Sequence, residues 1–66
     1  MLSTREVYEI EFRDQTPEEL NFLYDLSTLR YAAKLFDIKG RSKMNKIVLC
    51  LNIEQYLIDK GLNHGL

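Results

Sequence analysis

The chain has 66 residues, 45% of them hydrophobic and 29% charged, which leaves room for one small domain whose core contributes no more than about 3–5 kcal/mol. One cysteine and one histidine exclude a disulfide within the chain and a structural zinc site, and no apolar run approaches the roughly 20 residues of a membrane span. The formal net charge of −1 conceals a strong polarity. Residues 1–25 hold seven carboxylates and two arginines, whereas residues 26–46 hold six cations and one carboxylate. Partners must therefore be considered for each part separately.

Residues 1–15 are predicted to form an N-terminal arm that contains the single strand of the chain, residues 7–12. Apolar side chains alternate there with Glu9 and Glu11, which is the period of a half-buried strand. A lone strand has two unpaired edges, so we expect it to pair with its copy in a homodimer. The alternative is an extended arm over the helices with its edge in water. The residues predicted to lie at this dimer or partner strand are Val7, Tyr8, Ile10 and Phe12.

A first helix is predicted over residues 16–26. Thr16 supplies an N-cap hydroxyl, Pro17 suits the first helical position, and Glu19 is spaced to close a capping box. This is the clearest local signal in the chain.

Two further helices are predicted over about residues 28–36 and 43–59, with Ser27 and Ser42 as their N-caps and Gly61 as the end of the second. Apolar side chains surround most of the second helix, so we expect it to be buried on two sides, against the preceding helix and against either the N-terminal arm or another chain. Between the helices, Asp37 is expected to adopt a left-handed conformation and Ile38 to plug the core.

These elements predict a mostly α fold of about three helices and one strand in a single domain, residues 1–66, in which residues 27–60 form a helix-extension-helix module. Residues 61–66 are predicted to be a tail, and His64 is expected to have no catalytic role there. The lone Cys50 is expected to be a small buried hydrophobe.

Most of the positively charged residues lie on the predicted helix over residues 28–36 and in the extension after it. A helix N-terminus offers free N–H groups and the positive end of a dipole, which is a natural site for phosphate. We therefore expect this segment to bind nucleic-acid phosphates. The alternative is that the cations only solubilise a loop and that Ser42 only caps a helix. The predicted contact residues are Arg30, Lys34, Lys39, Gly40, Arg41, Ser42, Lys43, Asn45 and Lys46.

The same segment carries a resemblance to a known family. Leu29-Arg30, Ala33-Lys34 and the string Ile38-Lys39-Gly40-Arg41-Ser42-Lys43-Met44-Asn45-Lys46, followed by Leu49 and Ile53, resemble the small N-terminal domain of the transcription termination factor Rho and related SAP-like helix-extension-helix modules, over about residues 26–60. The resemblance implies two roughly parallel helices around the extension. It also implies DNA or RNA phosphates contacted near Lys39, Arg41, Ser42, Lys43 and Lys46. Asp37 stands where such modules commonly have glycine, and these 66 residues contain no RNA-binding barrel or ATPase phosphate loop, so termination activity is not implied.

The leading functional prediction is a small, non-enzymatic nucleic-acid-binding protein, cytoplasmic and homodimeric, with DNA favoured over RNA. No cofactor, metal site, membrane association or catalytic residue is expected, because the sequence holds no constellation for any of them. The alternative is a protein-binding adaptor or inhibitor of a larger machine. It would use the acidic residues Glu9, Glu11, Glu18 and Glu19, or add the strand of residues 7–12 to the sheet of a partner.

Overall fold

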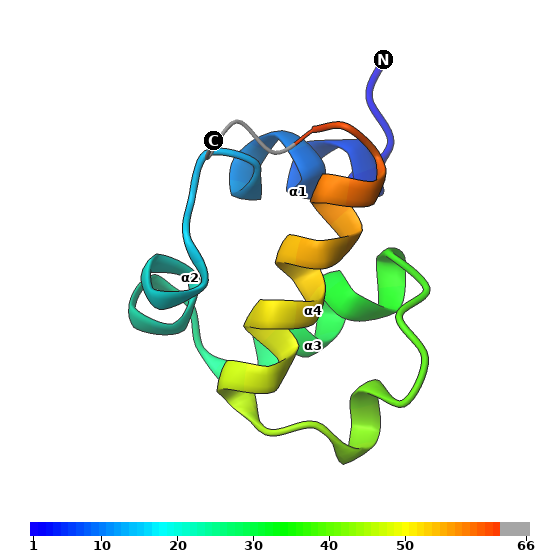
Figure 1. Ribbon diagram of the computed structural model, residues 1–66. Coiled ribbons are helices and arrows are strands. Elements are labelled where there is room, and N and C mark those ends of the chain that lie inside the picture. Colours follow the sequence, from blue (N-terminus) through cyan, green and yellow to red (C-terminus); the bar gives the residue numbers. More distant parts are fainter. Residues whose placement is uncertain (63–66) are drawn as a thin grey trace.

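Four α-helices and one short 3₁₀ turn account for the regular structure of residues 1–62, which are the residues that the computed structural model describes (Figure 1). In chain order they are α1 (Thr4–Phe12), α2 (Pro17–Leu23), α3 (Leu26–Leu35), η1 (Arg41–Lys43) and α4 (Lys46–Asp59). The prediction of a mostly α chain is confirmed. The predicted strand is wrong, because residues 1–62 contain no strand, and the structure has four helices rather than three. The prediction for His64 lies outside the described residues.

The segment predicted as a strand is helix α1. Its N-terminus is closed by a capping box, in which the backbone N–H of Glu6 donates to Oγ of Ser3 at 3.2 Å and the backbone N–H of Ser3 donates to Oε1 of Glu6 at 2.9 Å. Tyr8 and Phe12 are four residues apart, lie on one helical face and pack edge to face at 5.5 Å, whereas Ile10 is 46% exposed. The alternation of apolar and acidic residues therefore suggested a strand, although Tyr8 and Phe12 have the i,i+4 spacing of one helical face.

Dimerisation by strand pairing through Val7, Tyr8, Ile10 and Phe12 is accordingly wrong, because the backbone groups of these residues belong to a helix. Addition of this strand to the sheet of a partner is wrong for the same reason. A helix satisfies its backbone hydrogen bonds internally and presents no edge to a second chain.

Helix α2 begins as predicted. The backbone N–H of Glu19 donates to Oγ1 of Thr16 at 3.2 Å, and the backbone N–H of Thr16 donates to Oε1 of Glu19 at 2.8 Å. The helix ends at Leu23, earlier than predicted, because Asp25 caps the next helix by accepting the backbone N–H of Thr28 at 2.9 Å. Asp25, rather than Ser27, is therefore the N-cap of α3.

Helix α4 forms the centre of the fold and runs through most of the height of the molecule in Figure 1. It packs against α3, as predicted, and against α2 as its second neighbour, while α1 packs against α3. Cys50 is buried in it, as expected. The accessible surface of 4510 Å² is close to the roughly 4,400 Å² of a folded monomer of this size. The core consists of Phe12, Leu20, Leu29, Ala32, Ala33, Phe36, Leu49, Cys50, Ile53 and Leu57.

Aromatic rings and two phenol–carboxylate hydrogen bonds hold α1 on this core. The centroid of the Phe12 ring lies 4.9 Å from that of the Tyr24 ring. Two tyrosines outside α1 also donate hydrogen bonds to carboxylates of α1. The hydroxyl of Tyr56 donates to Oε2 of Glu9 at 2.5 Å, and the hydroxyl of Tyr24 donates to Oε2 of Glu11 at 2.8 Å. Helix α1 is thereby tied to α4 and to α2.

No helix within residues 1–62 combines the length and the apolar character needed to cross a membrane.

Candidate anion-binding surface at the α3–α4 extension

The chain leaves α3 through a Schellman motif. The backbone N–H of Ile38 donates to the carbonyl of Ala33 at 3.0 Å, and that of Asp37 donates to the carbonyl of Lys34 at 3.1 Å. Asp37 has the left-handed φ of 57° that was predicted for it, and Ile38 packs against the core as expected. Gly40 follows with φ of 74°, a conformation that disfavours any side chain. The extension therefore has a defined backbone path.

Helix α4 begins three residues later than predicted. Residues 41–43 form the turn η1, in which the backbone N–H of Lys43 donates to the carbonyl of Gly40 at 3.0 Å. Ser42 is exposed and caps nothing, whereas Oδ1 of Asn45 accepts the backbone N–H of Val48 at 3.0 Å. Met44, between the two elements, is extended and packs against the core, which explains the break. The predicted cap at Ser42 is thus wrong, and Asn45 is the true cap.

Two of the predicted contact cations, Lys39 and Arg41, are already engaged within the chain, and a third, Lys46, lies near a carboxylate. Nζ of Lys39 lies 3.5 Å from Oδ1 of Asp37, in a pair that is more than 80% exposed on both sides. Nη1 of Arg41 donates to the carbonyl of Ile38 at 3.2 Å. The pKa of the Asp25 carboxyl is lowered, mainly by hydrogen bonds from Thr28 and Ser27 and to a smaller extent by the charge of Lys46. Lys46 therefore lies in the electrostatic field of the Asp25 carboxylate, but no carboxylate of residues 1–62 lies within 4.0 Å of its ammonium.

The other three cations are free of such partners. Among residues 1–62, no carboxylate lies within 4.0 Å of Arg30, Lys34 or Lys43, and none of these side chains donates a hydrogen bond. Arg30 and Lys34 lie four residues apart on α3 and are exposed, and η1 with Lys43 packs beside α3. The fold thus places helix α3, which carries Arg30 and Lys34, next to the turn η1, which carries Lys43.

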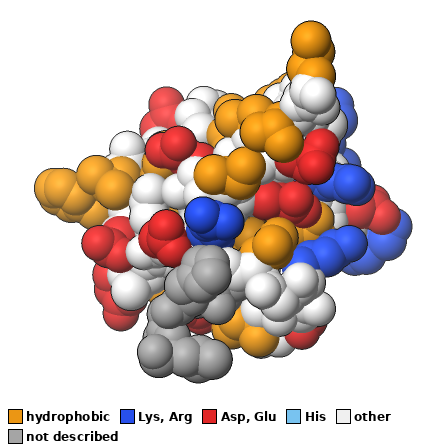
Figure 2. Space-filling view, turned by 90° about the horizontal axis from the view of Figure 1, so that it is seen from above, with side chains coloured by type: hydrophobic (Ala, Val, Ile, Leu, Met, Phe, Trp, Pro, Cys, Tyr) orange, Lys and Arg blue, Asp and Glu red, His pale blue; other side chains and the backbone are white. Residues whose placement is uncertain are grey.

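The acidic residues of the alternative prediction are used differently. Glu9 and Glu11 accept hydrogen bonds from Tyr56 and Tyr24, and Glu19 closes the capping box of α2, which leaves Glu18 without a partner among the described residues. Figure 2 shows the end of the molecule over α1, where acidic side chains are interspersed with apolar and basic ones. These carboxylates mainly stabilise the fold rather than forming one continuous acidic face.

The described part of the chain contains no group of three or more His, Cys, Asp or Glu side chains placed to hold a metal ion. The pKa of the Cys50 thiol is raised because the residue is buried in the core, which favours the protonated thiol.

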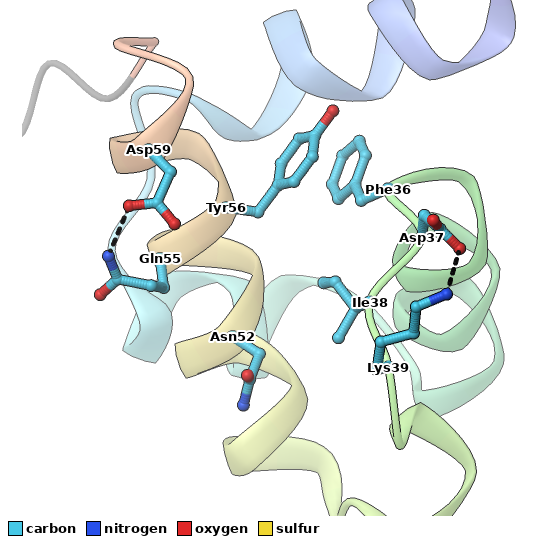
Figure 3. Close-up of a pocket in the computed structure, with 8 residues that line it drawn as sticks. All are labelled: Phe36, Asp37, Ile38, Lys39, Asn52, Gln55, Tyr56 and Asp59. Carbon is cyan, nitrogen blue, oxygen red and sulfur yellow. Dashed lines mark hydrogen bonds and ion pairs between the residues drawn. The ribbon is translucent and has the colours of Figure 1, made fainter.

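Sequence reasoning missed a groove between α4 and the residues that follow α3, which Asn52 and Gln55 line together with Ile38 (Figure 3). Neither amide residue forms part of a motif, and no local signal pairs them with a segment about 15 residues away in the chain. Only the packing of the extension on α4 creates this site.

No family model, curated protein or solved structure matches the chain.

Proposed function

We propose that this protein binds nucleic-acid phosphates through the cations of α3 and the α3–α4 extension and has no catalytic activity. The observation that supports this proposal is a contrast between the two signs of charge. Arg30, Lys34 and Lys43 have no carboxylate partner among residues 1–62, whereas every carboxylate except Glu18 and Glu54 accepts a hydrogen bond or an ion pair there.

Unpaired cations on neighbouring elements repel one another, and a polyanion relieves that repulsion. Arg30 and Lys34 form a like-charge i,i+4 pair, which destabilises a helix by about 0.2–0.5 kcal/mol. A phosphate backbone that bridges this pair and Lys43 would remove the cost and release bound counterions. The free cations therefore favour an anionic polymer over a neutral partner.

Four of the seven aromatic side chains are held within the fold and are not available for stacking on bases. Phe12 and Phe36 are buried, and Tyr24 and Tyr56 pack against them and donate their hydroxyls to glutamates. Such rings are not free to form a stacking platform for single-stranded bases. We therefore expect little base selectivity and a preference for duplex DNA.

Fluorescence anisotropy of labelled duplex DNA, single-stranded DNA and RNA at several salt concentrations tests this proposal. Three to four phosphate contacts predict a slope of log K against log salt of roughly −3 to −4 on duplex DNA. In Lys34→Gln with Lys43→Gln, the slope should become less negative by about 2. Lys60→Gln is the matched control, because Lys60 is an exposed cation outside α3 and the extension, and it should leave the slope unchanged.

Two results would contradict the proposal. One is the absence of binding at low salt by a protein that circular dichroism shows to be folded. The other is a loss of affinity per neutralised charge that is the same in the double variant and in Lys60→Gln, which would mean that only overall charge matters.

The homodimer stays a prediction, now without its strand. Exposed apolar side chains on α2 and α4, including Phe22, Leu23 and Leu51, are the surface that a second copy would cover. Sedimentation equilibrium at micromolar concentration measures this directly, and a single species of monomer mass would exclude the dimer in that range.

A further inference from the structure

A groove of about 320 Å³ opens between α4 and the segment that follows α3 (Figure 3). This volume lies at the lower end of the range of about 300–1,000 Å³ for small-molecule sites, so it has room for one long side chain. The residues that line the groove are Phe36, Asp37, Ile38, Lys39, Asn52, Gln55, Tyr56 and Asp59.

One part of the lining is apolar and rigid. The rings of Phe36 and Tyr56 are stacked, with centroids 4.3 Å apart and planes inclined by 8°, and Ile38 packs against the core beside them. The hydroxyl of Tyr56 is fixed by its bond to Glu9, and in Figure 3 it points away from the groove. This lining offers surface to methylene groups and to the edge of a flat, delocalised cation.

The polar part of the lining offers mostly acceptors. Nδ2 of Asn52 donates to the carbonyl of Val48 at 2.9 Å, and Nε2 of Gln55 donates to Oδ1 of Asp59 at 2.9 Å. The amide oxygens of Asn52 and Gln55 and the second carboxylate oxygen of Asp59 accept no hydrogen bond from residues 1–62. Three acceptors from one face of α4 thus remain open to a ligand that carries several donors.

The charges at the rim favour a cation. The lining contains two carboxylates, those of Asp37 and Asp59, and one ammonium, that of Lys39, which is paired with Asp37 at 3.5 Å. Lys60 lies over the Tyr56 ring at 5.6 Å but does not line the groove. Asp59 is therefore the carboxylate of the groove that has no cation within 4.0 Å among the described residues.

We propose that this groove receives an arginine side chain of a protein partner. Its methylene groups would lie along Ile38 and Tyr56, and its guanidinium would donate to the amide oxygens of Asn52 and Gln55 and to the carboxylate of Asp59. A guanidinium presents five donors in a planar fork, which matches several separate acceptors better than the compact ammonium of lysine. A phosphodiester of a nucleic acid carries no hydrogen-bond donor at neutral pH, and its negative charge is repelled by Asp59. The groove therefore serves a different partner from the cations of α3 and the turn.

Nuclear magnetic resonance titration of the ¹⁵N-labelled protein tests this inference. The probe is the capped pentapeptide acetyl-Gly-Gly-Arg-Gly-Gly-amide, and its matched control carries citrulline, which has the same shape without the charge. The arginine peptide should shift the side-chain amide signals of Asn52 and Gln55 in a saturable way. We expect it to bind at least about threefold more tightly than the citrulline peptide, because citrulline lacks the positive charge that strengthens the hydrogen bond to Asp59.

Two surface variants assign the binding to the groove. Asp59→Asn should weaken binding of the arginine peptide by about three- to tenfold, the range for a partly solvated charged hydrogen bond. Glu18→Gln removes a carboxylate of α2 outside the groove and should leave the affinity unchanged. Backbone amide spectra of each variant establish that it is folded.

Three outcomes would overturn the inference. The first is equal binding of the arginine and citrulline peptides, and the second is equal weakening by Asp59→Asn and Glu18→Gln. The third is a response of the Asn52 and Gln55 signals to a short RNA and not to the arginine peptide, which would identify the groove as a base site. None of these outcomes bears on phosphate binding by Lys34 and Lys43, which the salt dependence measures separately.

Discussion

Removal of the Tyr56 hydroxyl provides the sharpest test of how α1 is held on the core. Tyr56→Phe keeps the stacked contact with Phe36 at 4.3 Å and deletes only the 2.5 Å hydrogen bond to Glu9. The side chain of Glu9 is 14% exposed and would then retain only Arg5, at 3.9 Å, as a partner. The variant therefore separates one polar contact from the packing around it.

The magnitude follows from the ionisation of the phenol. Burial, together with the hydrogen bond to Glu9 and the charge of Glu9, raises the pKa of Tyr56 to about 12. Compared with an ordinary value near 10, this corresponds to about 2.7 kcal/mol in favour of the neutral phenol. Because the ring is partly exposed and water screens the carboxylate, we expect a smaller loss of about 1 kcal/mol in the variant at pH 7.

The pH dependence has a defined sign. The folded-state pKa of Tyr56 is raised, so its contribution is fully present below pH 10 and is lost as the pH rises through about 12. The difference in the free energy of unfolding between wild type and Tyr56→Phe should be largest at pH 7 to 9 and should vanish by about pH 12. Lysines also titrate in this range, but they contribute equally to both proteins.

Urea unfolding followed by circular dichroism measures this difference. With a denaturant slope of about 1 kcal/mol per molar, the midpoint of the variant should fall by about 1 M at pH 7, or its Tm by about 4–8 °C. Tyr31→Phe is the control, because the Tyr31 hydroxyl donates no hydrogen bond among the described residues. Equal midpoints for wild type and Tyr56→Phe, or an equal loss in both variants, would refute the tie between α1 and α4.

Three further predictions concern the termini of the helices and the core. Asn45→Ala should lower the Tm by about 4–8 °C through loss of the α4 cap, whereas Ser42→Ala should change it little; the reverse order would place the cap at Ser42. The pKa of Asp25 is lowered in the folded state, so its contribution to stability is present above its usual pKa and is lost as the pH falls through the lower folded-state value. In Asp25→Asn, stability should therefore depend less on pH below about pH 4. An unchanged pH dependence in this range would contradict the role of Asp25 as the cap. Phe12→Ala should cost about 3–5 kcal/mol and leave the chain largely unfolded, and a cooperative transition near that of wild type would show that α1 does not contribute to the core.

Local signals in the sequence were sufficient for much of the fold. The capping box at Thr16 and the left-handed Asp37 depend on side chains and backbone within a few residues, and both were predicted correctly. The segregation of charge along the chain was also evident from the sequence. A second local signal, the capping box between Ser3 and Glu6, was present but overlooked in favour of the alternating pattern.

The tertiary structure decided what short-range patterns leave open. Tyr8, Ile10 and Phe12 fit a strand or a helix, and the helix is the conformation that buries Phe12 completely. Glu9 acquires its partner Tyr56 from 47 residues away. Packing likewise determined which cations remained without carboxylates and created the groove beside α4. Burial and hydrogen bonding between distant segments are properties of the folded chain as a whole, because they exist only once the hydrophobic core has brought those segments together.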